Sequence, residues 1–270
     1  MPHADLLSTR IADGVAVVTL GSAKRIYFDP EMSDALCEAM TALGPDEAVR
    51  AIVVTGGAPG YFVRHYSVAA LIALGERLKG RDWPENSPYQ AGSFDSAMRL
   101  VETMPKPVIA AISGSAMGGG FEFCLACDIR IAQDGDFQIG LPEVNVGILP
   151  GGGGTQRLPR TIGTANALLH ILMGQTVSPR EAAAQGFVQE CVAGPALDRA
   201  MEIARRIATH TPESVGHIKR LVRGAAATPL DQGLALERNL FMKLCTGEPA
   251  LTRMKAYEAQ AVTEPSKSLG

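Results

Sequence analysis

Two glutamates stand among clusters of glycines in the middle of the chain. Glu122 follows the glycines at 118–120, and Glu143 precedes the glycine run at 151–154. Glycines at this density are entropically costly to order, so they favour a site where the backbone must approach a ligand closely. Carboxylates whose pKa values are tuned by burial can deprotonate a water or move a proton at a carbon next to a carbonyl. The pattern therefore indicates acid–base chemistry.

A helix that begins near Gly119 would position the first of these carboxylates. The first N–H groups of a helix have no intrahelical acceptor and carry the positive end of the helix dipole, which suits a developing negative charge. The Gly119 N–H is thus predicted to form half of an oxyanion hole, and Glu122 would lie on the same helical turn. Taken singly, Glu122 could be a dipole-favoured glutamate of a first turn, and Glu143 a solvated carboxylate in a loop. Together they fit the addition of water to a conjugated thioester better than hydride or phosphoryl transfer.

Competing motifs in the same stretch are incomplete. The sequence GGGGTQR lacks the lysine of a phosphate-binding loop, and the triple glycine lacks the G-x-G-x-x-G spacing of a dinucleotide fold. The segment SGSAMGG misses the G-x-S-x-G pattern because Ser113 occupies the place of the first glycine. A serine hydrolase remains a poorly supported alternative.

The elements that must carry these residues belong to an α/β protein. Apolar, β-branched runs predict strands in the first two thirds of the chain, and helical periodicity dominates the last third. Strands are expected at 15–20, 51–55, 108–112, 128–132 and 187–192. Helices are expected at 30–43, with Asp29 as N-cap, at 93–104, from 119, at 163–173, at 178–185 and over most of the chain from 195. Residues 80–92 have no periodicity and are predicted to form a loop over a site.

Composition and charge exclude several classes of function. Hydrophobic residues make up 46% and charged residues 20% of the chain, which is typical of a globular protein. A net charge of −3 provides no broad basic field for nucleic acid. No apolar run is long enough to span a membrane, and the first residues lack the pattern of an export signal, so we expect a cytoplasmic protein with neither membrane nor nucleic acid as partner.

The cysteines indicate reduced thiols. The chain has five, an odd and dispersed set. Cys124 and Cys127 form a C-x-x-C inside an apolar run, with no second pair to complete a zinc site. We interpret this pair as packing, with redox or metal chemistry as the alternative, and we predict no metal site.

The central motifs, read in order, resemble the crotonase superfamily of enoyl-CoA hydratases and isomerases. The similarity extends from about Val15 to Tyr257 and is densest between residues 106 and 190. The motifs that carry it are KPVIAA at 106–111, GGGFE at 118–122, Cys127-Asp128, Leu141-Pro142-Glu143 and PGGGGTQRL at 150–158.

The resemblance implies a crotonase-like spiral of ββα units at 1–195, which holds the active site, and a C-terminal helical oligomerisation region at 196–270, in a homotrimer or homohexamer. It also implies an acyl-CoA thioester substrate from fatty acid metabolism, with coenzyme A as part of the substrate and no separate cofactor. The thioester oxygen would accept from the N–H groups of Gly119 and Tyr66. By similarity, Glu122 would activate water and Glu143 would protonate the α-carbon. Substrate contacts are expected from Lys24, Arg64, His65, Gly118 and Gly151.

The resemblance favours an enoyl-CoA hydratase, because an isomerase usually keeps only one of the two glutamates. An enoyl-CoA isomerase or a β-diketone-type carbon–carbon hydrolase is the alternative within the superfamily, and a non-catalytic scaffold is the alternative outside it. The chain departs from the family where F-(S/A)-A-G-A-D is common, because residues 62–67 read FVRHYS. His65 replaces the usual glycine, as a packing substitution, a substrate contact or an added acid or base. Residues 26–28, IYF, likewise replace the usual Asn-Ala-Leu.

Overall fold

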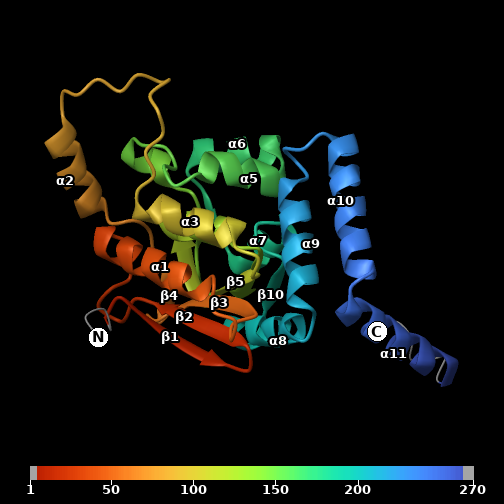
Figure 1. Cartoon of the computed structure of the whole chain (residues 1–270). Helices are drawn as coiled ribbons and strands as arrows, with labels where there is room; N and C mark the ends of the chain where they lie inside the picture. The colour runs from red at the N-terminus through yellow and green to blue at the C-terminus, as the bar shows by residue number, and fades with distance from the viewer. Residues whose placement is uncertain (1–4, 264–270) are drawn as a thin grey trace. The chain divides into compact units, whose positions relative to one another are not determined.

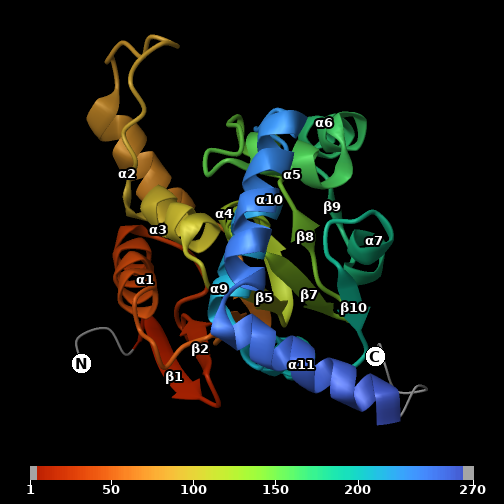
Figure 2. The same cartoon turned by 45° about the vertical axis from the view of Figure 1, so that its right-hand side comes forward.

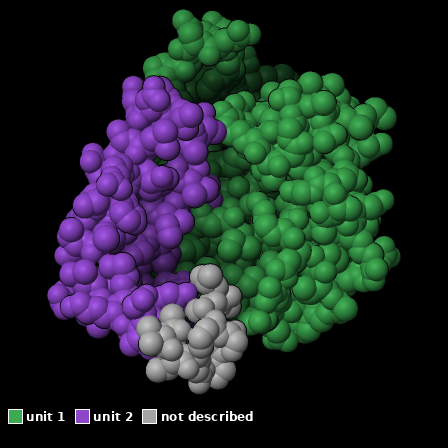
Figure 3. Space-filling model, turned by 90° about the vertical axis from the view of Figure 1, so that its right-hand side faces the viewer, with its two compact units in different colours: residues 1–208 green, residues 209–270 purple. Residues whose placement is uncertain are grey.

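The computed structural model describes residues 5–263. The chain divides into two compact units, residues 1–208 and residues 209–270, which Figure 3 distinguishes by colour. By its contacts, helix α8 (Ala196–Ala208) belongs to the first unit. The predicted division after residue 195, between a region that holds the active site and a region that forms the oligomer, is a division by role and stays a prediction.

A six-stranded sheet forms the base of the first unit, in the order β1-β2-β3-β5-β7-β10 (Figure 1). The strands are β1 (Leu7–Ala12), β2 (Val15–Leu20), β3 (Ala51–Gly56), β5 (Val108–Ile112), β7 (Ile129–Gln133) and β10 (Glu190–Val192). β1 pairs antiparallel with β2, and the other pairings are parallel. The inner strands β2, β3 and β5 are almost wholly buried, which explains their continuous apolar sequences. β1 was not predicted, because most of its residues are exposed.

A second, smaller sheet stands beside the first, in the order β4-β6-β8-β9. Its strands are β4 (Gly60–Val63), β6 (Gly114–Met117), β8 (Ile139–Gly140) and β9 (Thr176–Val177). Three strands of the large sheet are each followed along the chain by a strand of the small sheet and then by helix. The pairs of strands are β3 with β4, β5 with β6, and β7 with β8. This repeated strand, strand, helix order confirms the predicted spiral of ββα units.

Helices cover the large sheet on both faces. The first unit also holds α1 (Pro30–Leu43), α2 (Val68–Leu78), α3 (Ser93–Thr103), α4 (Gly119–Ala126), the 3-10 helix η1 (Glu143–Val146), α5 (Gly154–Ile162), α6 (Thr164–Met173) and α7 (Pro179–Ala184). The predicted N-cap of α1 is confirmed, because the Asp29 carboxylate accepts from the Met32 N–H at 2.8 Å. Buried alanines of α8 pack with β2, β3 and β5 in a core cluster separate from the main one. α2 and α5 were not predicted, because α2 buries no residue and glycines and a proline interrupt the pattern of α5.

The predicted packing of the two central cysteines agrees with their burial. Cys124 and Cys127 are buried in the main core, and burial raises the pKa of the Cys124 thiol well above its ordinary value. A raised pKa keeps the thiol protonated and unreactive. Within residues 5–263 no group of His, Cys, Asp or Glu has the arrangement of a metal site.

The second unit contains the helices α9 (Pro212–Gly224), α10 (Leu230–Cys245) and α11 (Glu248–Thr263) (Figure 2). An ion pair of 2.7 Å between Lys243 and Glu213 joins α10 to α9. None of the helices in the described part of the chain combines the length and the hydropathy needed to cross a bilayer. The assembly of several copies through this region stays a prediction.

Candidate active site

The triple glycine brings the start of α4 against the segment after β4. A Cβ on Gly120 would lie 2.0 Å from the Val63 carbonyl oxygen, and one on Gly119 would lie 3.2 Å from the Tyr66 nitrogen. Gly118 has a φ of +50°, and its N–H donates to the Gly140 carbonyl at 2.9 Å. Only glycines permit this approach of two backbones.

Two N–H groups are left without an acceptor at this contact. The flanking N–H groups are paired: that of Ser67 donates to the Phe28 carbonyl, and that of Gly118 to the Gly140 carbonyl. Between residues 5 and 263, no acceptor faces the N–H of Tyr66 or that of Gly119. Because the two backbones touch, a single oxygen atom can accept from both, which is the arrangement of an oxyanion hole.

Glu122 lies one turn into α4, as predicted, and its carboxylate is held in place. Its side chain is only 3% exposed, and Oε1 accepts from the Gly154 N–H at 2.8 Å. Burial raises the pKa of Glu122, while the N–H groups of Gly154 and Gly152 act in the opposite direction. A buried carboxylate with these partners is fixed in direction and strengthened as a base.

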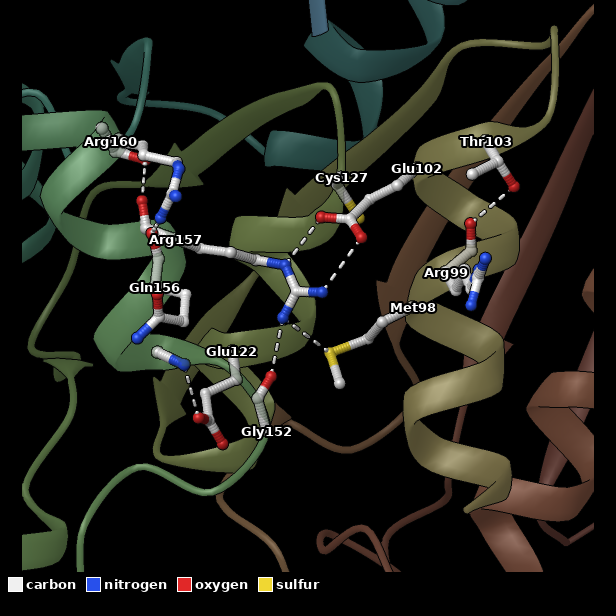
Figure 4. Close-up of polar contacts among 12 residues, drawn as sticks. Met98, Arg99, Glu102, Thr103, Glu122, Cys127, Gly152, Gln156, Arg157 and Arg160 are labelled. Atoms are coloured by element: carbon white, nitrogen blue, oxygen red, sulfur yellow. Dashed lines mark hydrogen bonds and ion pairs between the residues drawn. The ribbon is translucent and has the colours of Figure 1, made fainter. Parts of the chain in front are cut away.

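Arg157 holds the glycine loop that contacts Glu122 (Figure 4). Its guanidinium donates to both carboxylate oxygens of Glu102, at 2.7 and 3.0 Å, and to the Gly152 carbonyl at 2.7 Å. The loop also needs Gly153, whose φ is +93°. Sequence reasoning included Arg157 only as part of a motif, because its partner Glu102 lies on α3, far away in the sequence.

Glu143 starts the 3-10 helix η1 rather than lying in a loop, so that part of the prediction was wrong. Pro142 precedes it, and the chain closes into a tight turn ended by Gly147 at a φ of +78°. Its Oε2 is buried and has no hydrogen-bond partner among the described residues. Burial, and then the charge of Glu122, raise the pKa of Glu143 to about 7. This carboxyl can therefore hold a proton near neutral pH and release it.

A cavity of about 610 Å³ joins these groups. The residues predicted for the site that line it are His65, Tyr66, Gly118, Gly119, Glu122, Glu143 and Gly151. Lys24 and Arg64 are not among its lining residues. The Arg64 guanidinium donates to the Tyr27 hydroxyl at 3.1 Å, and the Lys24 side chain is exposed. Their contacts with a substrate stay predictions.

Comparison with known proteins identifies the family of this chain. The sequence model described as enoyl-CoA hydratase/isomerase matches residues 10–259. The chain belongs to the enoyl-CoA hydratase/isomerase family. The resemblance to the crotonase superfamily is thereby confirmed.

Relatives in this family have several names. A "Probable enoyl-CoA hydratase" of Bacillus subtilis is 33% identical over 93% of this chain and 95% of its own length. A mitochondrial "Methylglutaconyl-CoA hydratase" of Rattus norvegicus is 33% identical over 83% of this chain and 70% of its own length. Among solved structures, an enoyl-CoA hydratase from Bacillus anthracis has a TM-score of 0.81 and 27% identity, covering 97% of this chain and 98% of its own. The fold is thus that of the family along nearly the whole chain.

His65 is the main departure from the family pattern inside the cavity. Its Nδ1 lies 2.6 Å from the carbonyl oxygen of Tyr66, and its ring lies 4.6 Å from that of Tyr27. These two contacts hold the imidazole at the edge of the oxyanion site. The packing and substrate-contact interpretations both agree with this position.

Sequence reasoning missed the apolar residues of the cavity. Phe94 of α3, three residues on one face of α2 and three residues that follow Glu143 all line it. The spacing of Val68, Leu71 and Leu74 was a signal for α2, because these residues repeat every third position. The signal was weak because the segment is short and, as the structure shows, none of its residues is buried.

Proposed function

We propose that this protein is an enoyl-CoA hydratase, which adds water across the 2,3 double bond of an unsaturated acyl-CoA. One observation carries the proposal: Glu122 and Glu143 line the same cavity as the unpaired N–H groups of Gly119 and Tyr66. Family membership and the names of the relatives agree with this reaction. Coenzyme A enters as part of the substrate, and water is the co-substrate.

In this mechanism the thioester oxygen accepts from the N–H groups of Gly119 and Tyr66. Glu122 takes a proton from a water molecule as the water oxygen bonds to the β-carbon. The electron pair of the double bond moves toward the thioester, and the two N–H groups stabilise the resulting enolate oxygen. Glu143 then gives its proton to the α-carbon. Return of a proton from Glu122 to Glu143, through solvent, restores both carboxyl groups.

The environments of the two carboxyl groups suit these different roles. Glu122 accepts a hydrogen bond from the Gly154 N–H, which favours its charged form as a base. The pKa of Glu143, raised to about 7, keeps a proton available at neutral pH. Two carboxyl groups whose environments differ in this way can act as base and acid in one reaction.

The test follows the ultraviolet absorbance of crotonyl-CoA as its conjugated double bond is lost. We expect Glu122→Gln and Glu143→Gln each to lower kcat by about 10²–10⁴-fold, the usual contribution of a general acid or base. Glu38→Gln, a change at an exposed glutamate of α1, is the matched control and should retain activity. Full activity in either cavity variant, with unchanged thermal unfolding, would refute the assigned roles.

His65 motivates the second candidate, an isomerase or a carbon–carbon hydrolase, because it brings a titratable ring to the cavity. Product analysis with a 3-enoyl-CoA and with a β-diketone separates these reactions from hydration. For a hydratase we expect His65→Ala to keep most of the activity on crotonyl-CoA. Turnover of the β-diketone that disappears in His65→Ala would favour the hydrolase instead.

A further inference from the structure

Two walls of the cavity are apolar. Val68, Leu71 and Leu74 line it from α2, and Val146, Ile148 and Leu149 line it from the segment that follows Glu143. Side chains of both walls are exposed to solvent: Leu149 is 65% exposed and Leu74 is 40% exposed. Figures 1 and 2 show α2 projecting at the edge of the first unit, and none of its residues is buried. An apolar helix face that is not packed in the core is available to an apolar ligand.

The apolar face of α2 begins beside the oxyanion site. Tyr66 supplies one of the two unpaired N–H groups, and Ser67 caps α2 by accepting from the Ala70 N–H at 3.2 Å. Val68, Leu71 and Leu74 then follow at every third position, which extends the face over about 9 Å of helix. An acyl chain whose thioester oxygen lies at the Tyr66 N–H can therefore run along this face. Each methylene that it buries there strengthens binding.

Besides the imidazole of His65, the cavity is lined by four acidic side chains. They are Asp34, Asp95, Glu122 and Glu143. Within the described part of the chain, no lysine or arginine lines it, and nearby Arg157 is paired with the Glu102 carboxylate. An acyl group that ended in a second carboxylate would lose hydration here, find no lysine or arginine to replace it and be repelled by the carboxylates of Asp34 and Asp95.

We infer that this enzyme selects neutral, apolar acyl groups longer than crotonyl and rejects acyl groups that carry a second carboxylate. The inference rests on the proposed hydratase function and names the substrate class of the same site. The names of the relatives do not decide it, because a methylglutaconyl-CoA hydratase, whose named substrate has a second carboxylate, shares the same 33% identity with this chain as a probable enoyl-CoA hydratase.

The first experiment compares kcat/KM for crotonyl-CoA, 2-hexenoyl-CoA, 2-octenoyl-CoA and glutaconyl-CoA, so that the coenzyme A portion is constant. We expect 2-octenoyl-CoA to exceed crotonyl-CoA by about tenfold or more, as added methylenes in an apolar pocket allow. We expect glutaconyl-CoA to fall about 100-fold below 2-hexenoyl-CoA, which is similar in size. Equal values for these two substrates would overturn the inference.

The second experiment places a cation on the apolar wall. Leu74→Lys should lower the preference for 2-hexenoyl-CoA over glutaconyl-CoA by about tenfold, because the new ammonium group can pair with the second carboxylate. Ile72→Lys is the matched control, because Ile72 belongs to the same helix, is 61% exposed and does not line the cavity. It should leave the preference at the wild-type value. The same preference in Leu74→Lys and Ile72→Lys would contradict the assignment of this wall.

A binding measurement separates this inference from the proposed function. Calorimetric titration with the saturated thioesters hexanoyl-CoA and glutaryl-CoA needs no turnover. Tighter binding of hexanoyl-CoA supports the inference even if no enoyl-CoA is hydrated, a result that would refute only the hydratase function. Equal binding of the two thioesters would refute the inference, whatever the reaction.

Discussion

Replacing Gly152 with alanine would press directly on the carboxylate that is assigned to activate water. A methyl group at this position would lie 2.7 Å from Glu122 Oε2 and 2.8 Å from Phe94 Cε1. Ordinary van der Waals contact begins at 3.4 Å. The carboxylate must therefore retreat by the difference, roughly 0.7 Å, or the loop must move by a similar amount. Gly152 does not have a positive φ, so the alanine adds steric contact without backbone strain.

The magnitudes follow from this displacement. Overpacking of a well-packed site costs about 1–3 kcal/mol, and in a chain of this size each kcal/mol lowers Tm by about 2–4 °C. Displacement of a reacting group on the order of 1 Å can lower the rate about 10²-fold. We therefore expect Gly152→Ala to remain folded, with a modestly lower Tm, and to lose about 10²-fold in kcat on crotonyl-CoA.

The assay combines the loss of enoyl absorbance with thermal unfolding followed by circular dichroism. Gly194→Ala is the control, because a Cβ at Gly194 meets no atom within 4 Å and its φ is not positive. It should match the wild type in both measurements. Wild-type kcat in a folded Gly152→Ala protein would refute the reasoning, since the position of Glu122 would then not govern the rate.

Two further predictions concern the charges around the site. Burial raises the pKa of Glu143 to about 7 from an ordinary 4.5. Between these pH values the native state binds more protons than the unfolded state, so the contribution of this group to stability falls as the pH rises through that range. Glu143→Gln should therefore exceed the wild type in Tm by more at pH 7 than at about pH 5, and a difference that does not change with pH would contradict the shift. Arg157→Met should lower the free energy of unfolding in urea by about 1.5–3 kcal/mol, because it removes charge-assisted hydrogen bonds to Glu102 and the Gly152 carbonyl. The double variant with Glu102→Gln should lose less than the sum of the single variants, and strict additivity would show that the pair does not act as a unit.

Elements with strong local signals could be predicted from the sequence. Asp29 and Pro30 indicated the start of α1, and an unbroken apolar run indicated β5. β1 and α2 could not be predicted, since β1 is mostly exposed and α2 buries no side chain, so neither has a clear periodicity of burial. The position of Glu143 in a 3-10 helix was also missed, because such short turns have little sequence pattern.

The sequence by itself determined the relation between Gly119 and Glu122. These residues share the first turn of α4, and a helical turn depends on residues that are close in the chain. The glycines around them were equally visible as places of close backbone approach. Together with the ordered motifs, this local information was sufficient to indicate the family and its chemistry.

Only the tertiary structure decided what surrounds that turn. The pairing of β4 with β6 brings the Tyr66 N–H to Gly119, and the loop held by Arg157 brings the Gly154 N–H to Glu122. The raised pKa of Glu143 and the apolar wall of α2 depend on burial and on neighbours from distant segments. Burial and long-range contact are properties of the packed chain. The raised pKa that makes Glu143 a general acid and the apolar acyl site therefore arise only when the elements are assembled.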